Sequence, residues 1–219
     1  TDEQKAAFEA EGRRPHWRFK MKHQPIIWQD LIRGEVNFKG EDISDPVVIR
    51  ENGNPLYHLC SIIDDIDSDV THVTRGEDHV ANTAAHIQMF EALGAKPPEF
   101  AHLSLISAAD GSKLSKRFGS LSIFDVRDED GLEAMTVTSL LARLGTSDPI
   151  EAFSDIKPLI DSFDFAKFSR STPKFDSEEL ERLNSKILHD MSFDTAKERL
   201  TSLSLSDIDE AFWLAVRPN

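Results

Sequence analysis

Alternating apolar and polar residues dominate the first quarter of the chain and predict β-strands. Residues 16–21 alternate in this way, and the short segments 26–28, 35–38 and 47–50 also look like strands. Residues 2–11 are instead polar and helix-prone, and Gly12 after them is typical of a helix C-terminus. We therefore expect a short helix and then an antiparallel sheet module that ends near residue 55.

The pattern changes to alternating helices and strands after residue 55. Leu59, Ile62 and Ile63 are spaced as on one face of a helix. Three further segments follow: a β-branched strand at 70–74, a helix at 82–93 and a short apolar strand at 102–106. Helix, strand, helix and strand in this order predict a parallel sheet layer.

The remainder of the chain is predicted to be mainly helical. Apolar periodicity indicates four helices, at residues 132–144, 177–189, 194–203 and 207–216. Asp176 or Ser177 is suited to cap the second of these, and the acidic residues of its first turn favour a helix N-terminus. The fold class is therefore α/β.

Composition restricts the class of protein without deciding its function. No apolar run approaches the roughly 20 residues that a membrane helix needs, and the N-terminus does not resemble a secretory signal. Cys60 is the one cysteine of the chain, so an internal disulfide is excluded and a reducing compartment is favoured. We expect a cytoplasmic protein.

The net charge of −14 at first argues against a nucleic-acid partner. Residues 1–50, however, carry equal numbers of basic and acidic side chains. Basic residues are concentrated in two places: Arg13, Arg14, Arg18, Lys20 and Lys22, and then Lys113, Lys116 and Arg117. Because phosphates are bound by local basic patches, a specific nucleic-acid site remains open.

A glycine-flanked cationic segment at residues 111–119 is the first candidate for chemistry. It contains Lys113, Lys116 and Arg117 between two glycines, directly after the predicted strand 102–106. A mobile cationic loop of this kind can close over a polyphosphate and stabilise its developing charge. A solvated basic turn is the alternative, but the position after a strand of an α/β sheet favours function.

The segment 74–79 is the second candidate. Arg75 follows the strand 70–74, and an arginine at the end of a strand can bind a carboxylate through two hydrogen bonds. Asp78 and His79 begin the next helix and could contact hydroxyl groups or a base. An ion pair that fixes a loop explains the pattern equally well, so the spacing alone leaves both interpretations open.

Other constellations carry less information. Tyr57 and Ser61 are four residues apart and can share a helix face. The aspartates of residues 64–69 fit part of a calcium loop, but Val70 and Gly76 stand where that loop needs glycine and glutamate. The eight histidines form no ligand cluster in the sequence, and the nucleophile elbow and the phosphate-binding P-loop are both missing.

Three segments, in this order and spacing, resemble bacterial glutamyl-tRNA synthetases of class I. They are residues 56–65 (Leu-Tyr-His-Leu-Cys-Ser-Ile-Ile-Asp-Asp), 71–79 (Thr-His-Val-Thr-Arg-Gly-Glu-Asp-His) and 113–117 (Lys-Leu-Ser-Lys-Arg). The last is similar to that class's second signature, Lys-Met-Ser-Lys-Ser, from which Leu114 and Arg117 depart. Residues 12–19 resemble the start of the acceptor-stem-binding insertion, and residues 174–184 resemble the entry into the helical anticodon-binding half.

The resemblance implies four regions along the chain. They are part of the acceptor-stem-binding insertion at 1–55, the second half of a Rossmann-like catalytic domain at 56–118, a stem-contact region at 119–175, and the start of a helical anticodon-binding domain at 176–219. It also implies the activity of a glutamate–tRNA ligase, in which glutamate attacks ATP to form glutamyl-adenylate and is then transferred to tRNA. A monomer is expected.

Site residues are carried over from the resemblance position by position. Arg75 would bind the glutamate carboxylate, with Tyr57 and Ser61 lining the pocket, although many members have asparagine in place of Ser61. Asp78 and His79 would lie near the ribose and adenine of ATP. Lys113 and Lys116 would stabilise the triphosphate, Lys116 foremost. Mg²⁺ would arrive with ATP, no zinc site is seen, and Arg13, Arg14 and Arg18 would contact tRNA.

The first ATP signature of class I, His-Ile-Gly-His, does not occur in these 219 residues. We therefore expect that this span alone forms no adenylate, and measurable ATP–pyrophosphate exchange by the isolated span would refute that expectation. Two related alternatives are a catalytically dead tRNA-binding paralogue and a tRNA-modifying enzyme of the glutamyl-queuosine type. The helices predicted within 176–219 argue against the second. A third alternative is an unrelated acidic α/β protein, and it would require that the three motifs occur in family order by chance.

Overall fold

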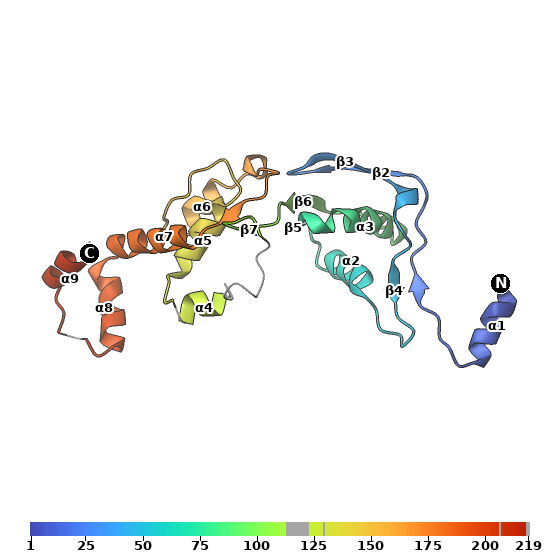
Figure 1. Ribbon diagram of the computed structural model, residues 1–219, viewed down its shortest axis with the longest axis horizontal. Helices are drawn as coiled ribbons and strands as arrows, with labels where there is room; N and C mark the ends of the chain where they lie inside the picture. Colours follow the sequence, from blue (N-terminus) through green and yellow to red (C-terminus); the bar gives the residue numbers. More distant parts are fainter. Residues whose placement is uncertain (113–122, 129, 206, 218–219) are drawn as a thin grey trace. The chain divides into compact units, whose positions relative to one another are not determined.

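The computed structural model describes residues 1–112, 123–128, 130–205 and 207–217, and these form two compact units (Figure 1). The first unit is Thr1–Leu105 and the second is Ile106–Asn219. The elements of the first unit, in chain order, are α1 (Asp2–Ala10), β1 (Trp17–Arg18), β2 (Pro25–Asp30), β3 (Gly34–Lys39), η1 (Gly40–Asp42), β4 (Val47–Ile49), α2 (Tyr57–Asp67), β5 (His72–Gly76), η2 (Glu77–His79), α3 (Val80–Ala92) and β6 (Glu99–Leu103).

A four-stranded sheet in the order β3-β2-β6-β5 forms the centre of the first unit. β5 and β6 run parallel through five residue pairs, whereas β2 and β3 form an antiparallel hairpin. β2 and β6 meet in parallel at Asp30 and Phe100. The predicted α/β class with a parallel sheet is confirmed.

The core of the first unit is formed by apolar side chains of β2, α2, α3 and β6 and by Met21, which precedes β2. Its buried members are Met21, Ile26, Trp28, Ile62, Ala84, Ala85, Met89, Phe90 and Phe100. Burial alternates strictly along β2, as a strand with one face on the core requires. α3 is buried over most of its length, so it is the central helix of this unit.

Two expectations about the strands are corrected by the structure. The segment 1–55 was expected to form an antiparallel sheet module; its pairs β1–β4 and β2–β3 are antiparallel, but β2 also joins β6 in the four-stranded sheet. The strand expected at 102–106 is β6, which ends at Leu103, and Leu105 and Ile106 are exposed. A further strand, β7 (Ser107–Ala108), follows, so residues 111–119 do not come directly after the four-stranded sheet.

The second unit is mainly helical around a two-stranded parallel sheet of β7 and β8. Its other elements are α4 (Ile123–Asp128), α5 (Ala134–Arg143), α6 (Lys157–Asp161), η3 (Phe165–Lys167), β8 (Lys174–Phe175), α7 (Ser177–Asp190), α8 (Phe193–Ser202) and α9 (Glu210–Val216). Its core contains Val126, Leu140, Phe175, Leu180 and Leu183.

Several predicted helix ends are confirmed. Asp176 caps α7 by accepting a hydrogen bond from the Glu178 backbone N–H. Gly12 adopts a φ of 76° directly after the end of α1, the left-handed conformation that glycine tolerates best. The four regional limits expected from the resemblance remain predictions.

Candidate functional site

Arg75 lies near the carboxyl end of β5, and the parallel pairing puts it directly opposite His102 of β6. Gly76 then ends the strand, and the turn of η2 leads into α3. The carboxyl ends of parallel strands are the usual position of ligand sites in α/β sheets. Arg75 is half-buried at this position.

Three neighbours fix the Arg75 guanidinium. Nη1 donates a hydrogen bond to the Tyr57 hydroxyl at 3.0 Å, Nε donates to His102 Nε2 at 3.3 Å, and Nη2 donates to Thr83 Oγ1. A guanidinium has five N–H groups. One on each terminal nitrogen thus has no hydrogen-bond partner among the described residues. Burial lowers the pKa of Arg75, and Tyr57 and Asp65 act in the opposite direction.

Tyr57 covers the outer side of this arrangement. It is the first residue of α2, and 47% of its surface is exposed. Its ring lies 5.6 Å from that of His86 and 5.9 Å from that of His79, centroid to centroid. Ser61 stands one turn further along α2 and is half-buried. The structure therefore brings Tyr57, Arg75 and His79 together, and their roles toward glutamate and ATP remain predictions.

The turn between β5 and α3 holds Asp78 and His79. His79 Nδ1 lies 3.0 Å from Asn82 Nδ2, and its Nε2 lies 3.8 Å from a carboxylate oxygen of Asp78. The turn is anchored by Glu77, which accepts a hydrogen bond of 2.7 Å from Arg33 Nη1. An imidazole and a carboxylate are thus presented next to Arg75.

Three buried polar residues behind Arg75 were not predicted. Asp30, Thr83 and His102 are 4%, 0% and 0% exposed. Asp30 Oδ2 lies 2.5 Å from His102 Nδ1, and Thr83 Oγ1 lies 2.8 Å from His102 Nε2. Burial acts to raise the pKa of Asp30, but hydrogen bonds from the His102 side chain and from backbone N–H groups lower it to about 2.

The sequence did contain one signal for Asp30. Ile26, Trp28 and Asp30 alternate along β2, so the aspartate shares a face with two core residues. A carboxylate on a buried face needs a partner. That partner is His102, 72 positions along the chain, which single-sequence reasoning could not identify.

A pair of histidines closes the inner side of the Tyr57 ring. His58 Nδ1 lies 2.9 Å from His86 Nε2, and His86 is 2% exposed. Burial, with the positive charge of Arg75 nearby, lowers the pKa of His86 to about 3. Burial and Arg75 also lower the pKa of His58. Both imidazoles are therefore neutral around pH 7.

The low pKa of His86 predicts a stability that depends on pH. The unfolded chain binds a proton at this histidine below about pH 6.5 while the folded chain does not, so stability falls as the pH drops below 6.5. Between pH 7 and pH 5 this histidine should contribute a loss of up to about 2 kcal/mol. Urea unfolding at both values should show a smaller loss in His86→Gln. The exposed His23→Gln serves as the control, and an unchanged loss in His86→Gln would refute the assignment.

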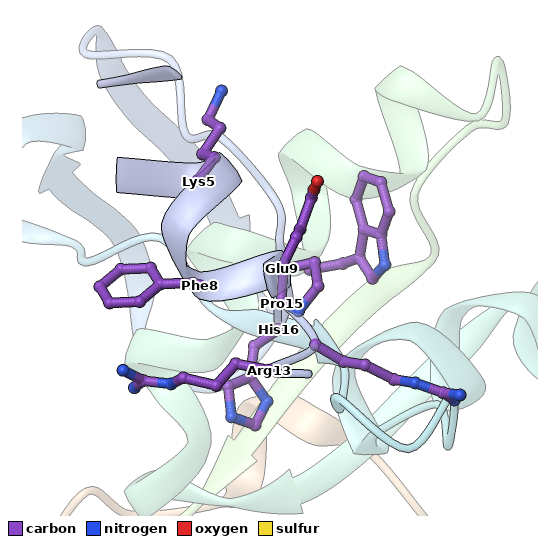
Figure 2. A pocket seen from close by; sticks show the side chains of 8 residues that line it. Lys5, Phe8, Glu9, Arg13, Pro15 and His16 are labelled. Carbon is purple, nitrogen blue, oxygen red and sulfur yellow. The ribbon is translucent and has the colours of Figure 1, made fainter. Parts of the chain in front are cut away.

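The basic residues of the N-terminal part lie on the surface. Figure 2 shows a hollow lined by Lys5, Phe8 and Glu9 of α1 and by residues 13–17 of the following segment. Arg13 lies over the Phe8 ring, 4.4 Å from its centroid. Arg14 is exposed, whereas Arg18 Nη1 donates to the Asp45 carbonyl at 2.7 Å. Arg13 and Arg14 therefore present charge to solvent, while Arg18 is engaged with the backbone.

Lys113 and Lys116 lie outside the described residues, together with the rest of residues 113–122. Within the described ranges, no group of three or more histidine, cysteine, aspartate or glutamate side chains is arranged to hold a metal ion. None of the helices in the described part of the chain is long and apolar enough to cross a bilayer.

Comparisons with known proteins point in one direction. The family model for the catalytic domain of class I tRNA synthetases (E and Q) matches residues 1–182. The chain is 55% identical over 219 residues to glutamate–tRNA ligase 1 of Maricaulis maris (strain MCS10) and 54% identical over 218 residues to glutamate–tRNA ligase of Azospirillum brasilense. These matches cover 100% of this chain and 49% of each relative, so the chain spans about half the length of the curated relatives it matches.

A solved structure shares the fold. It is the glutamate tRNA ligase from Elizabethkingia meningosepticum in complex with its amino acid, with a TM-score of 0.81 and 27% sequence identity. That match covers 100% of this chain and 49% of the other.

Proposed function

Because the chain belongs to the family of class I tRNA synthetases for glutamate and glutamine, we propose that the whole protein attaches glutamate to tRNA. In this reaction the glutamate α-carboxylate attacks the α-phosphate of Mg²⁺-bound ATP, which gives glutamyl-adenylate and pyrophosphate. The glutamyl group then passes to the terminal adenosine of tRNA, and AMP leaves. The described residues support the amino-acid part of this proposal most directly.

The observation that carries the proposal is the fixed guanidinium of Arg75. Its contacts with Tyr57, Thr83 and His102 leave one N–H on each terminal nitrogen for a ligand. Two N–H groups from one guanidinium match the two oxygens of a carboxylate. The Tyr57 hydroxyl accepts from Arg75, so its own proton can be donated to the same ligand. Glutamate, with two carboxylates, fits this chemistry.

Further residues take roles around this anchor. Ser61 lines the glutamate pocket from α2, next to Tyr57. Asp78 and His79 contact the ribose and adenine of ATP from the turn after β5, where a nucleotide would lie beside the amino acid. Lys113 and Lys116 neutralise the triphosphate charge that develops during adenylate formation.

Equilibrium binding tests the amino-acid part of the proposal. Isothermal titration of the whole protein, in the presence of tRNA and a non-hydrolysable ATP analogue, should show binding of L-glutamate and much weaker binding of L-glutamine. The shorter L-aspartate should also bind poorly, because its side-chain carboxylate cannot reach Arg75 when the amino group and α-carboxylate are held. Equal affinities for the three amino acids would contradict the proposal.

Arg13, Arg14 and Arg18 are proposed to contact tRNA. Arg14 is the most suitable for a test because it is exposed, whereas Arg18 is tied to Asp45. If Arg14 contacts one phosphate, Arg14→Gln should weaken tRNA binding and reduce the slope of log affinity against log salt by roughly 1. Filter binding across a salt series checks this. Lys96→Gln, which removes an exposed lysine between α3 and β6, is the control, and an unchanged slope in Arg14→Gln would exclude the contact.

Two other activities are separable by experiment. A catalytically dead tRNA-binding paralogue would bind tRNA without ATP–pyrophosphate exchange. An enzyme of the glutamyl-queuosine type would transfer glutamate to a modified base instead of the 3′ end of tRNA. The helices α7, α8 and α9 favour the ligase, because the resemblance of this region is to an anticodon-binding half. We further propose a cytoplasmic monomer.

A further inference from the structure

Asp30, His102 and Thr83 are buried behind Arg75 and form a chain of hydrogen bonds. The carboxylate at one end and the guanidinium at the other fix which atoms of the chain donate and which accept. We propose that Asp30 and His102 are positioning residues for Arg75: Asp30 holds the His102 proton on Nδ1, so that His102 Nε2 accepts from Arg75 and orients its guanidinium. The identity of the carboxylate that Arg75 then binds rests on the proposed function. The hydrogen-bond chain itself follows from which of its atoms can donate a hydrogen bond and which can accept one.

Asp30 defines the acceptor end. Its Oδ1 accepts from the backbone N–H groups of Ile32 at 3.1 Å, Arg33 at 3.0 Å and His102 at 3.2 Å. Its Oδ2 faces His102 Nδ1. With a pKa of about 2, Asp30 carries no proton near neutral pH. The proton between Asp30 and His102 must therefore reside on Nδ1.

Arg75 defines the donor end. A guanidinium nitrogen has no acceptor capacity, so the contact between Arg75 Nε and His102 Nε2 requires a lone pair on Nε2. If Nε2 carried a proton, two N–H donors, one of His102 and one of Arg75, would face each other with no acceptor between them. A doubly protonated His102 would also bring a like charge within 3.3 Å of Arg75. The geometry therefore selects the neutral imidazole with Nδ1 protonated.

Thr83 links the two ends a second time. Its Oγ1 accepts from Arg75 Nη2 and lies 2.8 Å from His102 Nε2, so with Nδ1 protonated its own proton points to Nε2 rather than to the His79 carbonyl at 3.4 Å. Thr83 and His102 are fully buried, where a misdirected donor is costly. Thr83 and His102 thus fix two N–H groups of Arg75 and Tyr57 fixes a third, which leaves two without a partner among the described residues.

Nuclear magnetic resonance tests the proton position directly. The whole protein, labelled with ¹⁵N-histidine, should show for His102 the long-range ¹H–¹⁵N pattern of a neutral imidazole protonated on Nδ1 at pH 7.5. Loss of the signal in His102→Gln assigns it. A neutral imidazole protonated on Nε2, or a doubly protonated imidazole, would overturn the proposal. No catalytic activity is needed for this measurement.

A change of Asp30 should move the proton. In Asp30→Asn the new side chain has a single oxygen, which the three backbone N–H groups would retain, so its NH₂ would face His102 Nδ1. His102 should then carry its proton on Nε2 and lose its bond with Arg75. For Asp30→Asn we expect a KM for glutamate raised about 10- to 100-fold with the KM for ATP changed less than about 2-fold. An unchanged tautomer, or equal changes in both KM values, would contradict the proposal.

A pair of Thr83 variants separates positioning from folding. Thr83→Ser keeps the hydroxyl, whereas Thr83→Val keeps the shape and loses the hydroxyl. We expect Thr83→Ser to retain the parental KM for glutamate and Thr83→Val to raise it. This result should not depend on which of the two variants unfolds at the lower temperature. If instead the KM follows thermal stability, the role of Thr83 is structural and the proposal fails.

Failure of this inference and failure of the proposed function give different results. If Arg75→Gln leaves the KM for glutamate unchanged, Arg75 is no carboxylate anchor and the proposed function fails. If Arg75→Gln raises it but Asp30→Asn and Thr83→Val do not, the anchor stands and the positioning role is refuted.

Discussion

In the whole protein, Arg75→Gln should lower kcat/KM for glutamate by about 30- to 5,000-fold, because removing one member of a buried charge pair costs about 2–5 kcal/mol. Most of the loss should appear in the KM for glutamate. The glutamine side chain keeps some hydrogen-bonding capacity but removes the charge and the planar set of donors. Steady-state tRNA charging over a series of glutamate concentrations measures the effect.

Two further variants make the Arg75 result specific. Arg75→Lys keeps the charge but cannot contact Tyr57, Thr83 and His102 at once, so it should also bind glutamate poorly. Arg182→Gln, which removes an exposed arginine of α7, should leave the kinetics unchanged. A KM for glutamate within about 3-fold of the parent in Arg75→Gln would show that Arg75 does not bind the substrate.

The second large effect is expected for Lys116→Ala. If its ammonium stabilises charge on the triphosphate as pyrophosphate leaves, its loss should lower kcat by roughly 100- to 1,000-fold, as for other groups that stabilise a developing charge. The KM for glutamate should change little, because Lys116 acts on ATP. ATP–pyrophosphate exchange in the presence of tRNA measures this step. Lys113→Ala should have a smaller effect.

Lys157→Ala is the matched control for the loop lysines. Lys157 is an exposed lysine of α6 whose ammonium pairs with Asp161 at 2.8 Å, far along the chain from residues 113–117. Its removal should leave exchange unchanged. If Lys116→Ala catalysed ATP–pyrophosphate exchange at the parental rate, the lysine loop at residues 113–117 would have no role in the mechanism.

Local patterns predicted most helices and strands. Apolar spacing located α2, α5 and α7 within a few residues, because each buries one face, and it also located α3, which is buried over most of its length. Capping residues such as Asp176 added their ends. These features depend on neighbours in the sequence, so they can be read from a single chain.

The arrangement of the sheet could not be predicted in this way. β2 joins the parallel strands through a pairing of Asp30 with Phe100, and nothing local to either residue indicates the other. The short strands β7 and β8 pair across a similar separation. Two-residue strands carry too little pattern to be recognised before their partners are known.

The candidate site divides in the same way, into residues that local segments indicate and residues that only the fold brings together. Tyr57, Arg75 and His79 belong to segments that resemble the family, and they lie together in the structure. His102 and Asp30 contact each other from 72 positions apart, so the alternation along β2 marks Asp30 as buried but does not indicate its partner. A buried polar residue shows its purpose only when its partner is found.

The central claim is that the whole protein charges tRNA with glutamate through the site around Arg75. The most direct test is to incubate the whole protein with tRNA, ATP and radiolabelled glutamate or glutamine, and to measure label on the 3′ end of the tRNA. We predict that glutamate is attached, that glutamine is not, and that Arg75→Gln abolishes the signal at low glutamate concentration. Binding of tRNA with no glutamate attached to it would contradict the claim.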